Sequence, residues 1–272
     1  MKIFIMLLPL LIFAKTVSVS ILPQKYIVNR IAPDIEVNVM VPKGANPATY
    51  SPKPSQIKAV KSSPLYFTIG VPFERANLQK LKSINPDMKI TDMGRYLKRF
   101  PISGHHHEDE EHAHPDPHLW LSPPHLMLLA RATLEELTLL NPKRAKEYVK
   151  RYENFVKELA ALDRDVYSKL LPIKKRAFLV YHPSFGYFAK VYRLRQIAIE
   201  KEGKEPSGRY LAKLVKEAKG VKILIIEPQF PKKSARFLAK RIGAKIVVID
   251  PLEYNVTKTI SKLAEEIAKY SH

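Results

Sequence analysis

Two lobes of mostly parallel β-sheet, joined by one long backbone helix, form the α/β fold that three features of the sequence predict. Short apolar runs alternate with amphipathic helical segments in both halves of the chain. The alternation stops near residue 140 and restarts near residue 177. Between these points no glycine or proline interrupts residues 143–171, which predicts a helix of roughly 43 Å.

The first half of the chain contains four expected strands and the helices between them. Each strand is a short run rich in apolar and β-branched residues, and proline or glycine marks several of the boundaries. We expect an N-terminal lobe over residues 15–140. Its strands are residues 17–21, 36–41, 65–70 and 88–93, and its helices are residues 23–31, 55–62, 73–81 and 126–140.

The second half repeats this alternation after the connecting helix, which we place at residues 141–171 because Asn141-Pro142 is a helix-start signal. A C-terminal lobe over residues 172–272 follows. Its expected strands are residues 177–181, 196–200, 221–226 and 245–249, and its expected helices are residues 183–191, 207–218, 233–242 and 256–269.

The N-terminal residues and the composition indicate an exported protein. Residues 1–14 carry one lysine and then an unbroken apolar run, which predicts a signal peptide cleaved near Ala14. The run is too short to span a membrane. The sequence contains no cysteine, so disulfides, thiolate metal sites and a lipid-modified N-terminal cysteine are not expected. We therefore expect a free periplasmic protein and a monomer.

The formal net charge of +20 raises the possibility of nucleic-acid binding. The lysines and arginines are spread along amphipathic helices rather than gathered in one tract with aromatic residues. An exported protein also rarely meets nucleic acid. The sequence therefore favours a solvated basic face and no nucleic-acid partner.

A histidine-rich tract indicates metal binding. Six of the nine histidines fall between His105 and His118. Residues 105–114 mix histidine with acidic residues and predict a mobile loop that collects metal, or a solvated linker. His118 follows in an apolar segment bounded by prolines, where ordered structure resumes. Neutral imidazole is a good zinc ligand.

Three more polar residues directly follow expected strands, where ligands bind in doubly wound sheets. These residues are His182, Glu227 and Asp250. His118, His182 and Asp250 together offer two imidazole nitrogens and a carboxylate, which suits tetrahedral zinc with one open position. We expect Glu227 to orient a ligand imidazole or to cap a helix.

The sequence resembles the metal-binding solute-binding proteins of ABC transporters, and in particular their zinc-uptake branch. The matching segments are SILPQKYIVNRIA (residues 20–32), PKGANPATYSPKPSQ (42–56), DPHLWLSP (116–123), VYHPSFGYFAKVY (180–192), EPQF (227–230) and IDPL (249–252). The resemblance implies two α/β lobes with the metal in the cleft between them. It also implies His118, His182 and Asp250 as ligands.

One position departs from the family pattern. The family's first-ligand motif, G-x-x-P-H-x-Y, has alanine in place of histidine here, at Ala48. Alanine cannot coordinate a metal, so three explanations remain open. A histidine of the tract, His112 or His114, supplies the fourth ligand; water fills the position; or tight binding has been lost.

The expected function is therefore extracytoplasmic capture of Zn²⁺ and its delivery to a membrane ABC permease, without enzymatic activity. One alternative is a zinc hydrolase that uses the open coordination position with Glu227 as base, although no HExxH motif is present. The other is a metal-independent adhesin or partner protein, which only the Ala48 departure supports.

Overall fold

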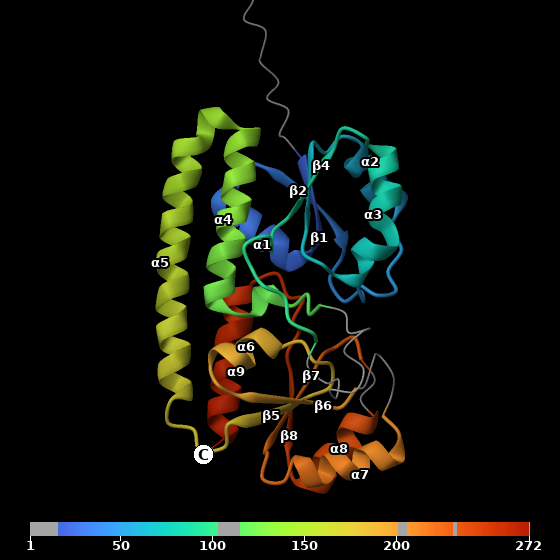
Figure 1. Cartoon of the computed structure of the whole chain (residues 1–272), viewed down its shortest axis with the longest axis vertical. Coiled ribbons are helices and arrows are strands. Elements are labelled where there is room, and N and C mark those ends of the chain that lie inside the picture. The colour runs from blue at the N-terminus through green and yellow to red at the C-terminus, as the bar shows by residue number, and fades with distance from the viewer. Residues whose placement is uncertain (1–15, 103–114, 201–205, 231–232, 272) are drawn as a thin grey trace, which may run out of the picture.

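The computed structural model describes residues 16–102, 115–200, 206–230 and 233–271. Over these residues the chain forms two α/β lobes, one above the other along the long axis of the molecule (Figure 1). The expected signal peptide of residues 1–14 and the histidine tract of residues 105–114 lie outside the described residues.

The N-terminal lobe contains a four-stranded parallel sheet with the strand order β2-β1-β3-β4. Helices α2 and α3 cover one face of the sheet, and α1 and α4 lie on the other (Figure 1). Val19 of β1 and its neighbours Ser18 and Ser20 are all buried, because both faces of the sheet are covered. The elements are β1 (Thr16–Ile21), α1 (Leu22–Ile31), β2 (Glu36–Val41), α2 (Pro54–Lys61), β3 (Leu65–Thr68), α3 (Pro72–Ile84), β4 (Lys89–Asp92), the 3₁₀ turn η2 (Leu119–Leu121) and α4 (Pro123–Leu140).

The C-terminal lobe has the same strand pattern, in the order β6-β5-β7-β8, and its strands are again parallel. Alternate residues of β5 face opposite sides. Phe178 and Val180 join the main core, while Leu179 joins a second apolar cluster under α7 and α8. The elements are β5 (Ala177–Val180), α6 (Gly186–Val191), β6 (Arg195–Ala198), α7 (Gly208–Glu217), β7 (Ile223–Ile226), α8 (Lys233–Ile242), β8 (Lys245–Val248) and α9 (Val256–Tyr270).

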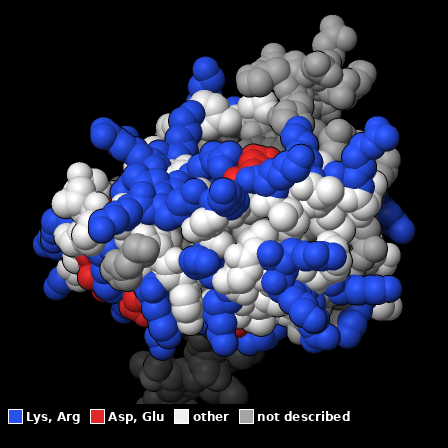
Figure 2. All heavy atoms as spheres, turned by 90° about the horizontal axis from the view of Figure 1, so that it is seen from below, with Lys and Arg blue, Asp and Glu red and all other residues white. Residues whose placement is uncertain are grey.

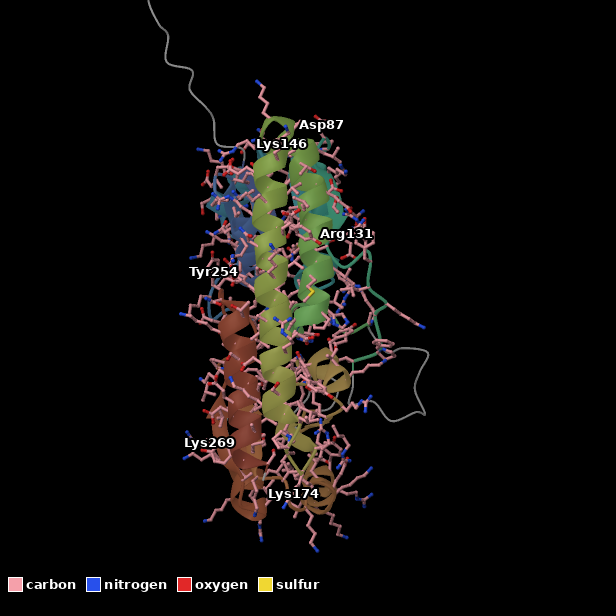
Figure 3. The ribbon with its side chains drawn as sticks, turned by 90° about the vertical axis from the view of Figure 1, so that its left-hand side faces the viewer. Asp87, Arg131, Lys146, Lys174, Tyr254 and Lys269 are labelled. Carbon is pink, nitrogen blue, oxygen red and sulfur yellow. The ribbon has the colours of Figure 1, made fainter. Side chains whose placement is uncertain are left out.

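Helix α5 (Ala145–Leu170) runs past both lobes. It packs against α1 and α4 in the upper part of the molecule and against α9 in the lower part. Figure 3 shows this arrangement, with Arg131 of α4 beside the upper part of α5 and Lys269 of α9 near its lower end. Its buried residues, among them Tyr148, Phe155 and Leu159, belong to one apolar core that includes residues of both lobes. The predicted long helix is confirmed, at about 39 Å for 26 residues.

Two local details differ from the sequence-based expectation. The start of the long helix is a 3₁₀ turn, η3 (Pro142–Arg144), in which the Arg144 N–H donates to the Asn141 carbonyl at 3.0 Å. Helix α6 begins at Gly186, three residues later than predicted. The chain turns after β5, where the Ser184 N–H donates to the His182 carbonyl at 2.8 Å. Within the described ranges, none of the helices is both long and apolar enough to cross a membrane.

Candidate metal-binding site

His118 lies at the start of η2, and a neighbouring aspartate fixes its ring. The Asp116 Oδ1 atom accepts the backbone N–H of His118 at 2.9 Å and lies 2.7 Å from its Nδ1 atom. Only 8% of His118 is exposed. Asp116 is itself buried, and its backbone N–H donates to the Phe100 carbonyl at 2.7 Å. The local Asp-Pro-His sequence therefore holds the imidazole in one orientation.

His182 follows β5 and is held by residues of the C-terminal lobe. Its Nδ1 atom lies 3.0 Å from Oε1 of Glu200, which follows the adjacent strand β6. The Phe230 ring stacks on the imidazole with centroids 5.0 Å apart and an interplanar angle of 19°. Burial is the largest single effect on the pKa of His182 and lowers it. The hydrogen bond to Glu200 and the nearby carboxylate charges together outweigh burial, so the pKa lies above its ordinary value.

The two imidazoles face each other across the junction between the lobes. Their ring centroids are 5.4 Å apart in an edge-to-face arrangement. In each neutral ring the carboxylate at Nδ1 selects the tautomer with the proton on that atom, which leaves the Nε2 lone pair available. Neither Nε2 atom has a hydrogen-bond partner among the described residues. Two imidazole nitrogens are thus in place to bind a borderline metal.

Asp250 follows β8 and is held on one side only. Its Oδ1 atom accepts the Gln229 Nε2–H and the Leu252 N–H, each at 2.9 Å. The next residue, Pro251, accepts the indole N–H of the buried Trp120 at 2.7 Å. This bond links the segment after β8 to the turn that carries His118, and so brings Asp250 to the same region of the molecule.

A complete ligand cluster is not present in the described part of the chain. No three histidine, aspartate or glutamate side chains there are arranged to hold one ion. The predicted set of His118, His182 and Asp250 therefore stays a prediction. The two histidines lie together, and Asp250 does not complete a three-residue cluster with them in the described ranges.

Glu227 has a different partner from either of the two that were expected. It is fully buried directly after β7, where its Oε2 accepts the backbone N–H of His182 at 3.3 Å and its Oε1 accepts the Ser184 hydroxyl at 3.4 Å. Glu200, rather than Glu227, contacts the imidazole. Burial raises the pKa of Glu227 to about 7. The residue fixes the backbone that carries His182.

The sequence-based reasoning missed the two carboxylates that hold the imidazoles. Asp116 lies in the segment DPHLWLSP, two residues before His118, and was not predicted to contact it. Glu200 ended an expected strand, which is the same signal that identified His182. Applying the strand-end rule to every strand would have found Glu200.

The segment around Ala48 lies beside the C-terminal lobe. Ala48 is exposed, and its N–H donates to the Asn46 side chain at 2.8 Å. Five residues earlier, Lys43 Nζ forms an ion pair with Glu253 Oε2 at 2.9 Å, which joins the two lobes. Asp250 also raises the pKa of Lys43, after the larger effect of Glu253, so the lysine charge lies close to the predicted ligand.

The two ends of the segment that contains the histidine tract meet near His118. Pro101 and Pro115 form an isolated antiparallel bridge. His112 and His114 themselves lie outside the described residues. Pro115 is three residues before His118, so the described residue that follows the tract lies close in the chain to one of the two imidazoles.

Comparison with known proteins gives one family. Residues 17–269 match the profile of ZnuA, described as zinc-uptake complex component A, periplasmic. The zinc-binding protein AdcA of Streptococcus pyogenes serotype M3 is 28% identical over 241 residues, which are 81% of this chain and 47% of that protein. The chain thus spans about half the length of this relative. A Thermotoga maritima protein, named for predicted metal binding, is 29% identical over 97% of this chain and 95% of its own length.

Solved structures agree with this family. A crystal structure of a ZnuA deletion mutant with zinc bound superimposes with a TM-score of 0.88 at 36% identity, covering 95% of this chain and 98% of that one. A second ZnuA crystal structure also gives 0.88, at 35% identity, and covers 95% of this chain and all of the other. The predicted fold of two parallel-sheet lobes with one long helix is confirmed, and so is the predicted resemblance.

Proposed function

The chain belongs to the family of periplasmic zinc-uptake component A, and from that premise we propose that it captures Zn²⁺ outside the cytoplasm and delivers it to an ABC permease for uptake. One observation carries the proposal. His118 and His182 face each other 5.4 Å apart, and each has its Nδ1 atom beside a carboxylate. A carboxylate at Nδ1 orients a ligand imidazole and raises the basicity of its Nε2 atom.

We propose His118, His182 and Asp250 as the protein ligands. Among the described residues the Oδ2 atom of Asp250 has no hydrogen-bond partner, while its Oδ1 atom is anchored by Gln229 and Leu252. A modest approach of the segment after β8 toward the imidazoles completes an N₂O donor set, which is typical of zinc sites that keep an open position. Glu227 and Glu200 position His182 from the C-terminal lobe.

The fourth position is open in this proposal because Ala48 has no donor atom. A histidine of the tract, His112 or His114, or a water molecule fills it. The bridge between Pro101 and Pro115 supports a role for the tract, because it fixes the base of that segment beside His118. An exchangeable fourth ligand also suits delivery, since a cargo ion must leave the site at the permease.

Calorimetric titration of zinc into the chelator-stripped protein at neutral pH tests the proposal. One tight binding event per chain is expected, with or without weaker events from the tract. Deleting residues 105–114 then separates the two sources of the fourth ligand. The tight dissociation constant stays unchanged if water fills the position and rises if the tract donates a ligand. Weak, multiple binding alone contradicts the proposed function and favours the metal-independent partner protein.

The pH dependence of affinity tests histidine ligation separately. Imidazole binds metal only when neutral, so zinc affinity should fall between about pH 7.5 and about pH 5.5. Because the pKa of His182 lies above its ordinary value, proton competition should begin early in this range. A flat affinity would exclude both histidines as ligands.

The geometry of Glu227 argues against the hydrolase alternative. A general base must reach the metal-bound water, but Glu227 is fully buried and both of its oxygens face the His182 and Ser184 segment. We also propose that the protein is a monomer, which sedimentation of the zinc-loaded and zinc-free forms checks directly.

A further inference from the structure

The outward face of α8 is basic along its whole length. The exposed residues Lys233, Arg236, Phe237, Lys240 and Arg241 recur at a spacing of three and four, which places them on one side of the helix. Ala235, Leu238 and Ala239 occupy the opposite side and pack into the second apolar cluster. The outward face therefore contains four basic residues, one aromatic ring and no acidic residue.

Helix α7 and the connecting loops extend this surface. Six more exposed bases lie in α7, in β8 or in the loop before β7. They are Arg209, Lys213, Lys216, Lys219, Lys222 and Lys245. Figure 2 views this end of the molecule from below and shows lysine and arginine side chains spread across it, with few acidic side chains between them. In the described parts of residues 206–249, Glu217 is the one exposed acidic residue, and Arg195 pairs with it at 3.1 Å. We call the exposed bases of α7, α8 and these loops the basic end.

In the N-terminal lobe and α5, several basic residues have an acidic partner. Arg30 pairs with Glu158 of α5, Lys89 with Glu136 and Arg95 with Glu135. No exposed base of α8 forms an ion pair in the described structure, and Arg241 instead lies 5.4 Å from the Phe237 ring centroid. A merely solvated surface does not require such one-sided charge. The bases of α8, which have no ion-pair partner among the described residues, fit a large anionic partner.

The chemistry of α8 identifies that partner as a membrane surface. Phe237 is 48% exposed in the middle of four bases. A helix with basic residues around an exposed aromatic ring is typical of binding at the interface of anionic bilayers, where the ring enters the headgroup region and the bases contact phosphates. α7 and α8 lie side by side beneath the C-terminal sheet, so their bases share one broad face (Figure 1).

We propose that the basic end binds the surface of a bilayer that contains anionic phospholipids. The proposal rests on the extracytoplasmic location but not on zinc binding. It goes beyond zinc capture, because it holds the protein at the surface of the membrane by electrostatic attraction. Diffusion along that surface then replaces a search through the surrounding volume for the permease.

Flotation of the full protein with phospholipid vesicles tests the proposal. We expect binding to vesicles that contain phosphatidylglycerol and none to vesicles of phosphatidylcholine alone. The triple variant R236Q/K240Q/R241Q should bind at least about tenfold more weakly, and added salt should abolish binding of the unmodified protein. Phe237→Ala should weaken binding by a smaller factor without changing its salt dependence.

A matched control removes the same charge elsewhere. Lys146, Lys150 and Lys157 are exposed on α5, on the side of the molecule away from α7 and α8, and none forms a described ion pair (Figures 1 and 3). The variant K146Q/K150Q/K157Q should bind vesicles like the unmodified protein. Equal loss in both triple variants would mean that only net charge matters and would overturn the proposal.

Two further outcomes would also overturn it. One is no binding to phosphatidylglycerol vesicles. The other is equally tight binding of the basic end to duplex DNA or to polyglutamate in competition with vesicles, which would indicate general polyanion binding. Zinc titration of the α8 variant reports independently on the proposed zinc site, and its zinc affinity should match that of the unmodified protein. Loss of lipid binding with zinc binding intact therefore separates this proposal from the proposed function.

Discussion

The two lobes share one topology, but a buried glutamate has a different role in each. Each has four parallel strands in corresponding order, β2-β1-β3-β4 and β6-β5-β7-β8. Each also buries a glutamate near the carboxyl end of its third strand in the chain, and burial raises the pKa of both Glu74 and Glu227 to about 7. The difference between the lobes lies in what these carboxylates hold.

In the N-terminal lobe the buried carboxylate has a structural role only. Glu74 accepts the Ile69 and Gly70 N–H groups at 2.9 and 2.7 Å and the Ser20 hydroxyl at 2.5 Å. In the C-terminal lobe Glu227 holds the backbone of His182, whose imidazole reaches the junction between the lobes. The same device thus closes a turn in one lobe and positions a proposed ligand in the other.

Replacing the imidazoles should have the largest effect on zinc affinity. His118→Ala and His182→Ala each remove a proposed zinc ligand. Each should weaken zinc binding by more than the roughly 10–100-fold that is typical for loss of a ligand's hydrogen-bond partner. Zinc titration by calorimetry measures the change.

His125→Ala is the matched control for these two variants. His125 lies in α4, where its Nδ1 atom contacts the Ser122 hydroxyl at 2.9 Å and its ring packs beside Tyr187. Its loss should leave the zinc affinity unchanged. Equal affinity of all three variants would remove both histidines from the ligand set.

Glu74→Gln tests whether the carboxylate of the N-terminal lobe titrates as its burial requires. The folded protein raises the Glu74 pKa from 4.5 to about 7, so it holds this proton more tightly than the unfolded chain does. The free energy of unfolding therefore falls as pH rises through this range, by on the order of 3 kcal/mol from this group. Denaturant unfolding at about pH 5 and about pH 8 should show a smaller difference in the variant.

Glu135→Gln provides the opposite case. Hydrogen bonds from Tyr96 and from two arginines lower the pKa of Glu135, so it is ionised in the folded protein and mostly ionised in the unfolded chain from pH 5 to pH 8. The pH dependence of unfolding in that range should match the unmodified protein. An unchanged slope in Glu74→Gln would show that another group causes it.

Periodicity predicted the elements of both lobes well, because each strand and helix is a local pattern. The bounds of β2 and of α8 agree with the predicted 36–41 and 233–242. The order of strands in a sheet is not local. Glu200 reaches His182 because β6 lies next to β5, and neither strand by itself shows that these two side chains meet.

The same reason limited what could be predicted about the site. His118 and His182 were identified from their places at the edge of the tract and at a strand end, and the structure brings them together. Their carboxylate partners depend on side-chain geometry. Asp116 was visible as a neighbour of His118 in the chain, but nothing in the sequence shows that its Oδ1 contacts both the backbone and the ring.

Removing these carboxylates should have an intermediate effect. Asp116→Asn and Glu200→Gln keep the size of each side chain but remove the charge that favours the Nδ1–H tautomer. Each should weaken zinc binding by about 10–100-fold. Titration of the two variants side by side compares the lobes directly. Unchanged affinity in one of them would assign the orientation of that imidazole to packing, by Trp120 for His118 or by Phe230 for His182.

The ion pair between Lys43 and Glu253 should have the smallest effect, with opposite signs for its two members. Lys43→Ala removes a positive charge near Asp250 and should strengthen zinc binding. Glu253→Gln leaves Lys43 without its partner, free to pair with Asp250 and compete with the ion, so binding should weaken. Lys43 is exposed and Glu253 is only half-buried, so each change should stay below about fivefold and shrink as salt is added.

Lys58→Ala separates this local effect from net charge. Lys58 is exposed on α2, away from the junction between the lobes, and its loss changes the total charge by the same amount. Its zinc affinity should equal that of the unmodified protein. If Lys43→Ala and Glu253→Gln shift the affinity in the same direction, the pair acts by holding the lobes together, because either substitution breaks that contact. Opposite shifts mean that the charges of Lys43 and Glu253 act electrostatically on the zinc site itself.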